Sequence, residues 1–331
     1  MGGDNAPQIV IEGAAQSKIR HPNLKFSFLG NKDKIVPLIN SLEILRNSNV
    51  IHTDEIIDAN EKPSIALRKG KHSSMGMAIQ LVKSGKADAI VSAGNTGALM
   101  AMSKLILRPM DGITRPAIAA YFPTIVGESC MLDLGANIEC DEKNLVEFSE
   151  MGSALHKALF PKEKTKVALL NVGSEEIKGT EIIKKAHNKL KEISINEDFD
   201  FNGYIEGNRI TDGESNVIVT DGFTGNIALK TAEGTAKFIT DNLKLSLKEN
   251  IFSKFSILFS YFSLKKFKEK LDPRKFNGAI FLGLNGPVVK SHGSTDSIGF
   301  YHSIDLCYNI VKGNLMSQIK DNLSHLNDNK I

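Results

Sequence analysis

Short apolar runs recur along the chain, and most of them end at Gly, Asn or Ser. Segments with a helical pattern lie between these runs, so strands and helices alternate. Such alternation predicts βαβ units around a mainly parallel sheet. The 331 residues are enough for one large α/β domain, which we expect to span 1–331. The clearest expected strands are 25–29, 87–92, 117–122, 129–133, 167–172 and 217–220.

Two of the runs lead into similar turns, DAIVSAGNTGAL at 88–99 and NVIVTDGFTGNIALK at 216–230. Ligands of parallel sheets collect beyond the carboxyl ends of the strands, and a helix start offers free N–H groups to an anion. The turns therefore predict anion binding, with a plain connecting turn as the alternative for each. The side chains closest to the expected anion are Ser92, Asn95, Thr96 and Gly97 in the first turn and Thr220, Asp221, Thr224 and Asn226 in the second.

Charge and cysteine content exclude several classes of protein. The net charge of +3 does not indicate a nucleic-acid partner. Cys130, Cys140 and Cys307 have no C-x-x-C spacing, so neither a disulfide framework nor a structural zinc site is expected. The N-terminal MGGDNAPQIV lacks the basic and apolar parts of a signal peptide, so a cytoplasmic protein is the simplest expectation.

The standard nucleotide-binding fingerprints are missing. No two glycines are spaced as G-x-G, which excludes the dinucleotide motif G-x-G-x-x-G. The phosphate loop G-x-x-x-x-G-K-[S/T], the zinc-protease motif H-E-x-x-H and the hydrolase motif G-x-S-x-G are absent as well. The turns are therefore predicted to hold an anion without a nucleotide loop.

The segment IFSKFSILFSYFSLKKF at 251–267 is unusually aromatic. On a helix its apolar residues share one face, and the segment is too short and too interrupted to span a bilayer. The basic run that follows suits an interfacial helix on anionic lipid, whereas a dimer-interface or core helix is the alternative. The residues expected to contact membrane or a partner are Phe255, Leu258, Phe259, Phe262, Lys265 and Lys266.

Taken together, several ordered motifs resemble the PlsX phosphate acyltransferases of bacterial phospholipid synthesis. The resemblance covers nearly the whole chain and is specific because the motifs keep their order. They are MGGDNAP at 1–7, ALRKGKHSSM at 66–75, ADAIVSAGNTGAL at 87–99, ITRPAIA at 113–119, LDLGANIEC at 132–140, LLNVGSEEIKG at 169–179, VIVTDGFTGNIALKTAEG at 217–234 and AIFLGLNGPVVKSHGS at 279–294.

The resemblance implies transfer of a fatty acyl group from acyl carrier protein to inorganic phosphate. The acyl phosphate formed would supply a membrane glycerol-3-phosphate acyltransferase. The implied fold is a homodimeric three-layer α/β/α sandwich related to phosphotransacetylase and isocitrate dehydrogenase, without metal or nucleotide cofactor. It also implies a helical projection, here 236–275, that contacts the membrane, and thus a cytoplasmic protein bound peripherally to it.

The chain departs from the family pattern at three places. Family members carry a short apolar strand before M-G-G-D, whereas this chain begins at that Met, so we expect either an earlier start or the loss of a central strand. The segment FNGYIEG has Tyr204 where an Asn is usual, and HGSTDSIGF has Thr295 at the second Ser of H-G-S-S.

Roles for the site residues follow from the resemblance and the two turns. We expect Ser92, Asn95, Thr96 and Gly97 to bind phosphate, with its charge neutralised by Arg115 or Lys178. Asp221, Asn226 and His292 are then expected to orient the nucleophile, polarise the carbonyl or protonate the departing thiolate.

Two rival functions remain open at this point. A phosphotransacetylase acting on coenzyme A thioesters would share the phosphate chemistry and the fold class. A non-catalytic scaffold would recruit lipid enzymes to the membrane through the 251–267 segment. Formation of acyl phosphate from acyl carrier protein and phosphate distinguishes all three.

Overall fold

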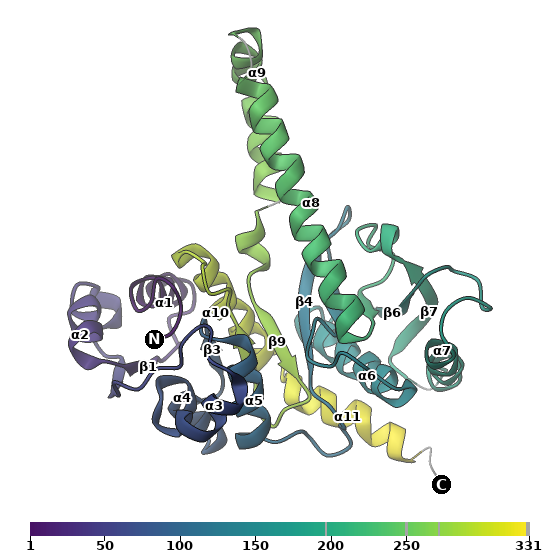
Figure 1. The fold of residues 1–331 in the computed structure, drawn as a ribbon, viewed down its shortest axis with the longest axis horizontal. Helices are drawn as coiled ribbons and strands as arrows, with labels where there is room; N and C mark the ends of the chain where they lie inside the picture. Colours follow the sequence, from purple (N-terminus) through teal and green to yellow (C-terminus); the bar gives the residue numbers. More distant parts are fainter. Residues whose placement is uncertain (196, 249–250, 271, 329–331) are drawn as a thin grey trace.

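The computed structural model describes residues 1–195, 197–248, 251–270 and 272–328, without the side chains of 248, 251–258 and 325–328. In the described part an eight-stranded sheet has the order β3-β10-β9-β4-β5-β8-β6-β7, and β1 and β2 form a separate parallel pair (Figure 1). The strands are β1 Ser27–Gly30, β2 Asn49–His52, β3 Ile90–Ser92, β4 Ala117–Pro123, β5 Glu128–Leu132, β6 Thr165–Asn171, β7 Phe199–Glu206, β8 Val217–Val219, β9 Ala279–Leu282 and β10 Val288–Lys290.

The sheet is mainly parallel, as predicted. β5, β8, β6 and β7 run in one direction, and β10 lies parallel to β3. The central strand β4 is antiparallel to both of its neighbours, β5 and β9. All six expected strands are confirmed, whereas β2, β7, β9 and β10 were not predicted.

Helices cover both faces of the sheet, which confirms the three-layer sandwich. Successive residues of a strand point to opposite faces, so Ala117 and Ala119 of β4 pack with α6, α10 and α11, whereas Ile118 packs with α4 and α5. The helices are α1 Gln8–Arg20, α2 Lys32–Asn40, α3 Pro63–Lys69, α4 Ser74–Lys83, α5 Thr96–Ile106, α6 Glu142–Leu159, α7 Glu181–Ile193, α8 Gly222–Lys248, α9 Ile251–Lys270, α10 Ser297–Lys312 and α11 Leu315–Asp328.

The N-terminal lobe, formed by α1–α5 and β1–β3, contains a groove between its two sheets. Among the described residues β1 pairs only with β2, and β3 pairs only with β10. The groove between the facing edges has a volume of ≈ 730 Å³ and is lined by residues of both strands and of α1, α4 and α10. A third core cluster joins α1, α2 and β1 to α10 through Ile11, Phe28 and Phe300.

Helices α8 and α9 lie side by side and project from the sandwich as an arm (Figure 1). The arm overlaps the segment 236–275 for which a helical projection is expected. The described aromatic side chains of α9 are exposed: Phe259 is 87% and Phe262 is 82% accessible. The predicted contact residues Phe255 and Leu258 lie outside the described side chains. None of the helices in the described ranges combines the length and apolar character needed to cross a membrane.

Candidate active site

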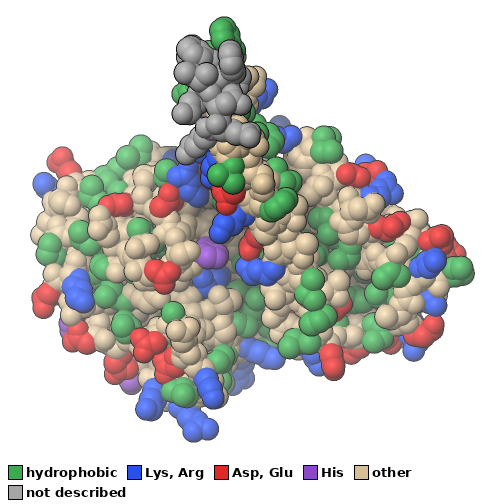
Figure 2. All heavy atoms as spheres, turned by 45° about the horizontal axis from the view of Figure 1, so that its top comes forward, with side chains coloured by type: hydrophobic (Ala, Val, Ile, Leu, Met, Phe, Trp, Pro, Cys, Tyr) green, Lys and Arg blue, Asp and Glu red, His purple; other side chains and the backbone are tan. Residues whose placement is uncertain are grey.

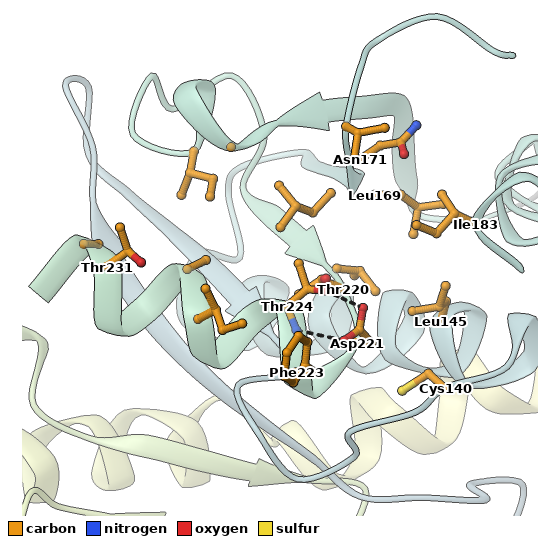
Figure 3. A pocket seen from close by; sticks show the side chains of 18 of the residues that line it. Cys140, Leu145, Leu169, Asn171, Ile183, Thr220, Asp221, Phe223, Thr224 and Thr231 are labelled. Atoms are coloured by element: carbon orange, nitrogen blue, oxygen red, sulfur yellow. Dashed lines mark hydrogen bonds between the residues drawn. The ribbon is translucent and has the colours of Figure 1, made fainter. Parts of the chain in front are cut away.

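A large pocket opens where β6 and β8 end and α8 begins (Figure 3). Its volume is ≈ 1690 Å³, and Asn171, Thr220 and Asp221 line it at the carboxyl ends of the strands. This is the edge at which parallel sheets bind ligands. The second turn found in the sequence therefore belongs to a pocket, as expected for a ligand-binding turn.

Asp221 stands at the start of α8 and is held by its own turn. One carboxylate oxygen accepts a hydrogen bond from the Thr224 backbone N–H, and the other accepts from the Thr224 hydroxyl, both at 2.8 Å (Figure 3). The carboxylate lies at the positive end of the helix dipole. Each oxygen keeps a further lone pair, so the oriented carboxylate of Asp221 can still accept a hydrogen bond from a ligand.

Glycine is required twice in the turn T-D-G-F-T-G-N because the backbone packs against the loop after β5. A Cβ on Gly225 would lie 1.9 Å from the Asp133 carbonyl oxygen, and one on Gly222 would lie 2.6 Å from the Asn137 carbonyl oxygen. The loop in turn is tied together by Asp133, whose carboxylate accepts N–H bonds from Ile118, Ala136 and Asn137. Burial nevertheless raises the pKa of Asp133.

Arg115 lies in the same pocket as Asp221 rather than with the first turn. Its guanidinium donates a 2.8 Å hydrogen bond to the Glu139 carbonyl oxygen, which leaves other N–H groups free for an anion. Cys140 lines the pocket as well. Burial, with the nearby negative charges of Asp133 and Asp221, raises the pKa of its thiol to about 11. Cys140 is therefore a neutral thiol and a poor nucleophile at neutral pH.

Asn171 shapes the loop that carries Lys178. Its side-chain N–H₂ donates to the carbonyl oxygens of Gly173 at 3.1 Å and Lys178 at 3.2 Å. Gly179 has φ +91°, and a Cβ there would lie 2.3 Å from the Asn171 side-chain oxygen. Lys178 itself is exposed and does not line the pocket. Asn226 lies beside the loop after β5, with its Cβ 3.5 Å from the Cβ position of Gly135.

The first turn, 92–97, lies in the N-terminal lobe. Asn95 caps α5: its side-chain oxygen accepts from the Ala98 N–H at 2.9 Å. Its N–H₂ group donates to the carbonyl oxygens of Asp58, Ala59 and Glu61. Within the turn Ser92 accepts from the Gly94 N–H, while Thr96 and Gly97 form the exposed first residues of the helix.

The loop that holds His292 lies next to the first turn. The Ser291 N–H donates to the Ser92 carbonyl oxygen at 2.8 Å, and β10 pairs with β3 in register. His292 is exposed, and its Nδ1 lies 3.0 Å from the Ser294 hydroxyl. The sequence groups His292 with Asp221 and Asn226 as residues that orient the nucleophile, polarise the carbonyl or protonate the thiolate, whereas the structure places His292 beside the first turn.

The two turns belong to different groups of residues. Neither 92–97 nor His292 lines the pocket that contains Asp221 and Arg115. Figure 2 shows a hollow below the base of the arm, between the N-terminal lobe and α8, in which Lys or Arg and His side chains are visible. A reaction that used both turns would have to take place across this hollow.

One buried cation was missed in the sequence. Lys290 is the last residue of β10, pairs in register with Ser92 and is 8% exposed. Burial lowers the pKa of its ammonium group to about 8, and the Asp4 carboxylate acts in the opposite direction. A single Lys directly after two valines, in the run VVK at 288–290, is the signal that could have revealed it. In the described ranges no group of three His, Cys, Asp or Glu residues is placed to hold a metal ion.

Comparison with known proteins identifies the family. A family model described as "Fatty acid synthesis protein" matches residues 1–318. The phosphate acyltransferase of Pelagibacter ubique (strain HTCC1062) is 51% identical over 323 residues, or 98% of this chain and 96% of that protein. The phosphate acyltransferase of Parvibaculum lavamentivorans is 48% identical over 328 residues, covering 98% of this chain and 90% of that protein.

Solved structures share the fold at low sequence identity. A phosphotransacetylase from Streptococcus pyogenes superposes with a TM-score of 0.61 at 18% identity, covering 94% of this chain and 92% of that chain. The EutD phosphotransacetylase from Staphylococcus aureus gives 0.59 at 17% identity, covering 93% and 91%. Fold, pocket and relatives together define an α/β enzyme of the acyltransferase class. The chain belongs to the fatty acid synthesis protein family.

Proposed function

We propose that the protein transfers a fatty acyl group from acyl carrier protein to inorganic phosphate, and that the acyl phosphate serves phospholipid synthesis. The observation that carries this proposal is the pocket itself, which joins Arg115 and Asp221 to a long apolar wall. Relatives of about 50% identity are named phosphate acyltransferases, and the phosphotransacetylase fold supports the same chemistry.

The reaction needs no covalent enzyme intermediate. Phosphate is a charged nucleophile and a thioester is an activated acyl donor, so holding the two in line supplies most of the rate gain, roughly 7–11 kcal/mol. The pKa of about 11 of the Cys140 thiol argues against an acyl-enzyme on the cysteine in the pocket. A phosphate oxygen attacks the thioester carbon, the carbon–sulfur bond breaks, and the thiolate of the carrier arm departs.

The two turns share the work in this proposal. Arg115 neutralises phosphate in the pocket, and Asp221 accepts a hydrogen bond from a protonated phosphate oxygen and so orients the nucleophile. The side-chain N–H₂ of Asn226, which follows on α8 just outside the pocket lining, polarises the thioester carbonyl. The turn of Ser92, Asn95, Thr96 and Gly97, with His292 and Lys290, faces the phosphate from the N-terminal lobe. Lys178 approaches on its exposed loop. The basic groups in the hollow of Figure 2 support this arrangement.

The decisive experiment is product formation with defined substrates. Hexadecanoyl acyl carrier protein and phosphate should give hydroxylamine-reactive acyl phosphate and free carrier thiol in equal amounts. Omitting phosphate should abolish both products, and Arg115→Ala should raise the KM for phosphate at least tenfold. Product from hexadecanoyl coenzyme A alone would favour the phosphotransacetylase reading. If neither thioester gives product, the non-catalytic scaffold is the function that remains.

Partners follow from the arm. Acyl carrier protein is acidic, so Lys265, Lys266 and Lys268 on the exposed side of α9 suit it as a docking surface. The exposed Phe259 and Phe262 suit insertion into the interfacial layer of a membrane. We further propose a cytoplasmic homodimer with its arms on the membrane, where a glycerol-3-phosphate acyltransferase takes up the product.

A further inference from the structure

The pocket continues far beyond the residues that the reaction itself needs. Small-molecule pockets usually enclose about 300–1,000 Å³, whereas this one has a volume of ≈ 1690 Å³. The excess space lies along α8, away from Asp221, and ends at Ile239 and at Phe267 of the arm. Its walls there are mainly apolar, with the hydroxyl groups of Thr231 and Thr235 as exceptions, so phosphate gains little from it.

One face of α8 forms the long wall of this space. Phe223, Ile227, Thr231, Thr235 and Ile239 recur every four residues and all line the pocket, in a row that winds slowly round the helix. At 1.5 Å per residue the wall is about 24 Å long from the first to the last of them. Phe223 is 58% and Ile227 is 50% exposed, so apolar surface along this face is open to an occupant.

A second row of residues on α8, all alanines, lies beside the first and leaves a shallow apolar trough along the helix. Ala228, Ala232 and Ala236 follow each other at one helical turn and also line the pocket. The buried residues Leu169 of β6 and Ile210 line the pocket as well. An apolar trough with a row of alanines along it suits a hydrocarbon chain better than a polar group.

We propose that this trough binds the acyl chain, with the thioester at Asp221 and the methyl end pointing to Ile239 and Phe267. The inference rests on the proposed function and adds the position and direction of the chain. Carbon–carbon bonds of about 1.5 Å at tetrahedral angles advance about 1.25 Å each, so a 16-carbon chain measures about 19 Å. The trough along α8 is long enough for it, and the methyl end comes to lie at the base of the arm.

The alanine row then acts as a ruler. The alanines are four residues apart, a rise of about 6 Å along the helix, which equals about five methylene groups. Phe in place of Ala228, Ala232 or Ala236 should therefore block chains above three different lengths, about 8, 13 and 18 carbons when the rise is counted from Asp221. The shortest limit belongs to Ala228, because it lies closest to Asp221.

The test compares Ala228→Phe, Ala232→Phe and Ala236→Phe with Lys237→Phe, which places the same side chain on an exposed position off the pocket lining. Acyl carrier thioesters of 6, 10, 16 and 20 carbons, which fall on either side of the three limits, are assayed for kcat/KM. Each alanine variant should lose at least tenfold above its own limit and stay within twofold of wild type below it. Lys237→Phe should match wild type at all lengths.

Binding of pyrene-labelled hexadecanoic acid, measured by fluorescence, separates this inference from the proposed function. If no thioester gives acyl phosphate but Ala228→Phe abolishes probe binding, the trough stands and the proposed reaction falls. Equal chain-length profiles in all four variants would overturn the trough. So would a changed sedimentation coefficient without a changed profile, because the trough would then be covered by a second copy of the chain.

Discussion

At the scale of single residues, the sequence located side chains but did not reveal how they are used. Asn95 was expected to hold phosphate, and the structure shows its amide occupied by the Ala98 N–H and by the carbonyl oxygens of 58, 59 and 61. The cap follows from the residue type, because Asn before a helix is a common N-cap. Its link to the 58–61 loop depends on a distant segment, which no local pattern contains.

Asn95 is therefore expected to position the turn 92–97 as well as to contact phosphate. Asn95→Ala should lower stability by about 1 kcal/mol, because it removes the cap, and raise the KM for phosphate. Asn95→Asp keeps the acceptor for the Ala98 N–H but loses the donors to the 58–61 loop. Thermal unfolding should recover in part in this variant, while the KM stays high. An unchanged phosphate KM in Asn95→Ala would remove the residue from the site.

Glu150 should make the protein less stable as the pH rises. The side chain is 0% exposed on α6, its oxygens have no hydrogen-bond partner among the described residues, and burial, with the nearby Glu197, raises its pKa to about 9. The folded state keeps a proton that the unfolded chain releases above about pH 4.5. Stability from this group is therefore complete below that pH and falls until about pH 9.

Glu150→Gln removes the titration and should stabilise the fold at alkaline pH. We expect a gain of roughly 2–4 kcal/mol at pH 8 and under about 1 kcal/mol at pH 5, since one pKa unit corresponds to about 1.4 kcal/mol. Urea unfolding at the two pH values measures the difference. Glu192→Gln, on an exposed position of α7, serves as the control and should change neither value. Equal gains at both pH values would contradict the assignment.

At the scale of elements, local patterns identified most strands and the helix α9. The six predicted strands are apolar runs that end in turn residues, and these cues are local. β9 and β10 are short, and a loop with two glycines separates them. Their strand character therefore comes from pairing with β3 and β4. The described part of α9 shows why amphipathicity was hard to judge: Phe259 and Tyr261 are both exposed although they lie on different sides of the helix.

The aromatic side chains of the arm test lipid binding, and its lysines, which suit anionic lipid as well, test carrier binding. Phe259→Ser with Phe262→Ser should weaken binding to vesicles of anionic phospholipid at least tenfold, because a fully buried Phe contributes about 1.5–3 kcal/mol. Lys265→Glu with Lys266→Glu should weaken binding of acyl carrier protein. Flotation and fluorescence titration measure the two. If the serine pair binds vesicles as wild type does, the arm has no membrane role.

At the scale of the whole molecule, the sheet is assembled from distant parts of the chain. β3 pairs with β10 through Ile90 and Val288, and β9 inserts between β10 and β4. Strand order of this kind is not encoded in local patterns. For the same reason the sequence predicted both turns of the site but not their assignment to different lobes, with Arg115 beside Asp221 and His292 beside Ser92.

The pairing of β9 and β10 with the rest of the sheet should keep the molecule associated after the chain is cleaved in the arm. A protease site inserted after Ser263, which is exposed on α9, should give two fragments that elute together under native conditions. The smaller fragment carries β9, β10, α10 and α11, whose side chains share the core of the sheet. Separate elution of the fragments without denaturant would refute this expectation.

The pairing of β3 with β10 also imposes a delay during synthesis, because β10 is made long after β3. The partners are about 200 residues apart, and a ribosome adds roughly 5–20 residues per second. The edge of β3 therefore waits about 10–40 s for its neighbour. During that time an apolar strand edge next to an unfinished core is open to wrong pairing. A newly made chain of this family should depend on chaperones most strongly just before its last 45 residues emerge.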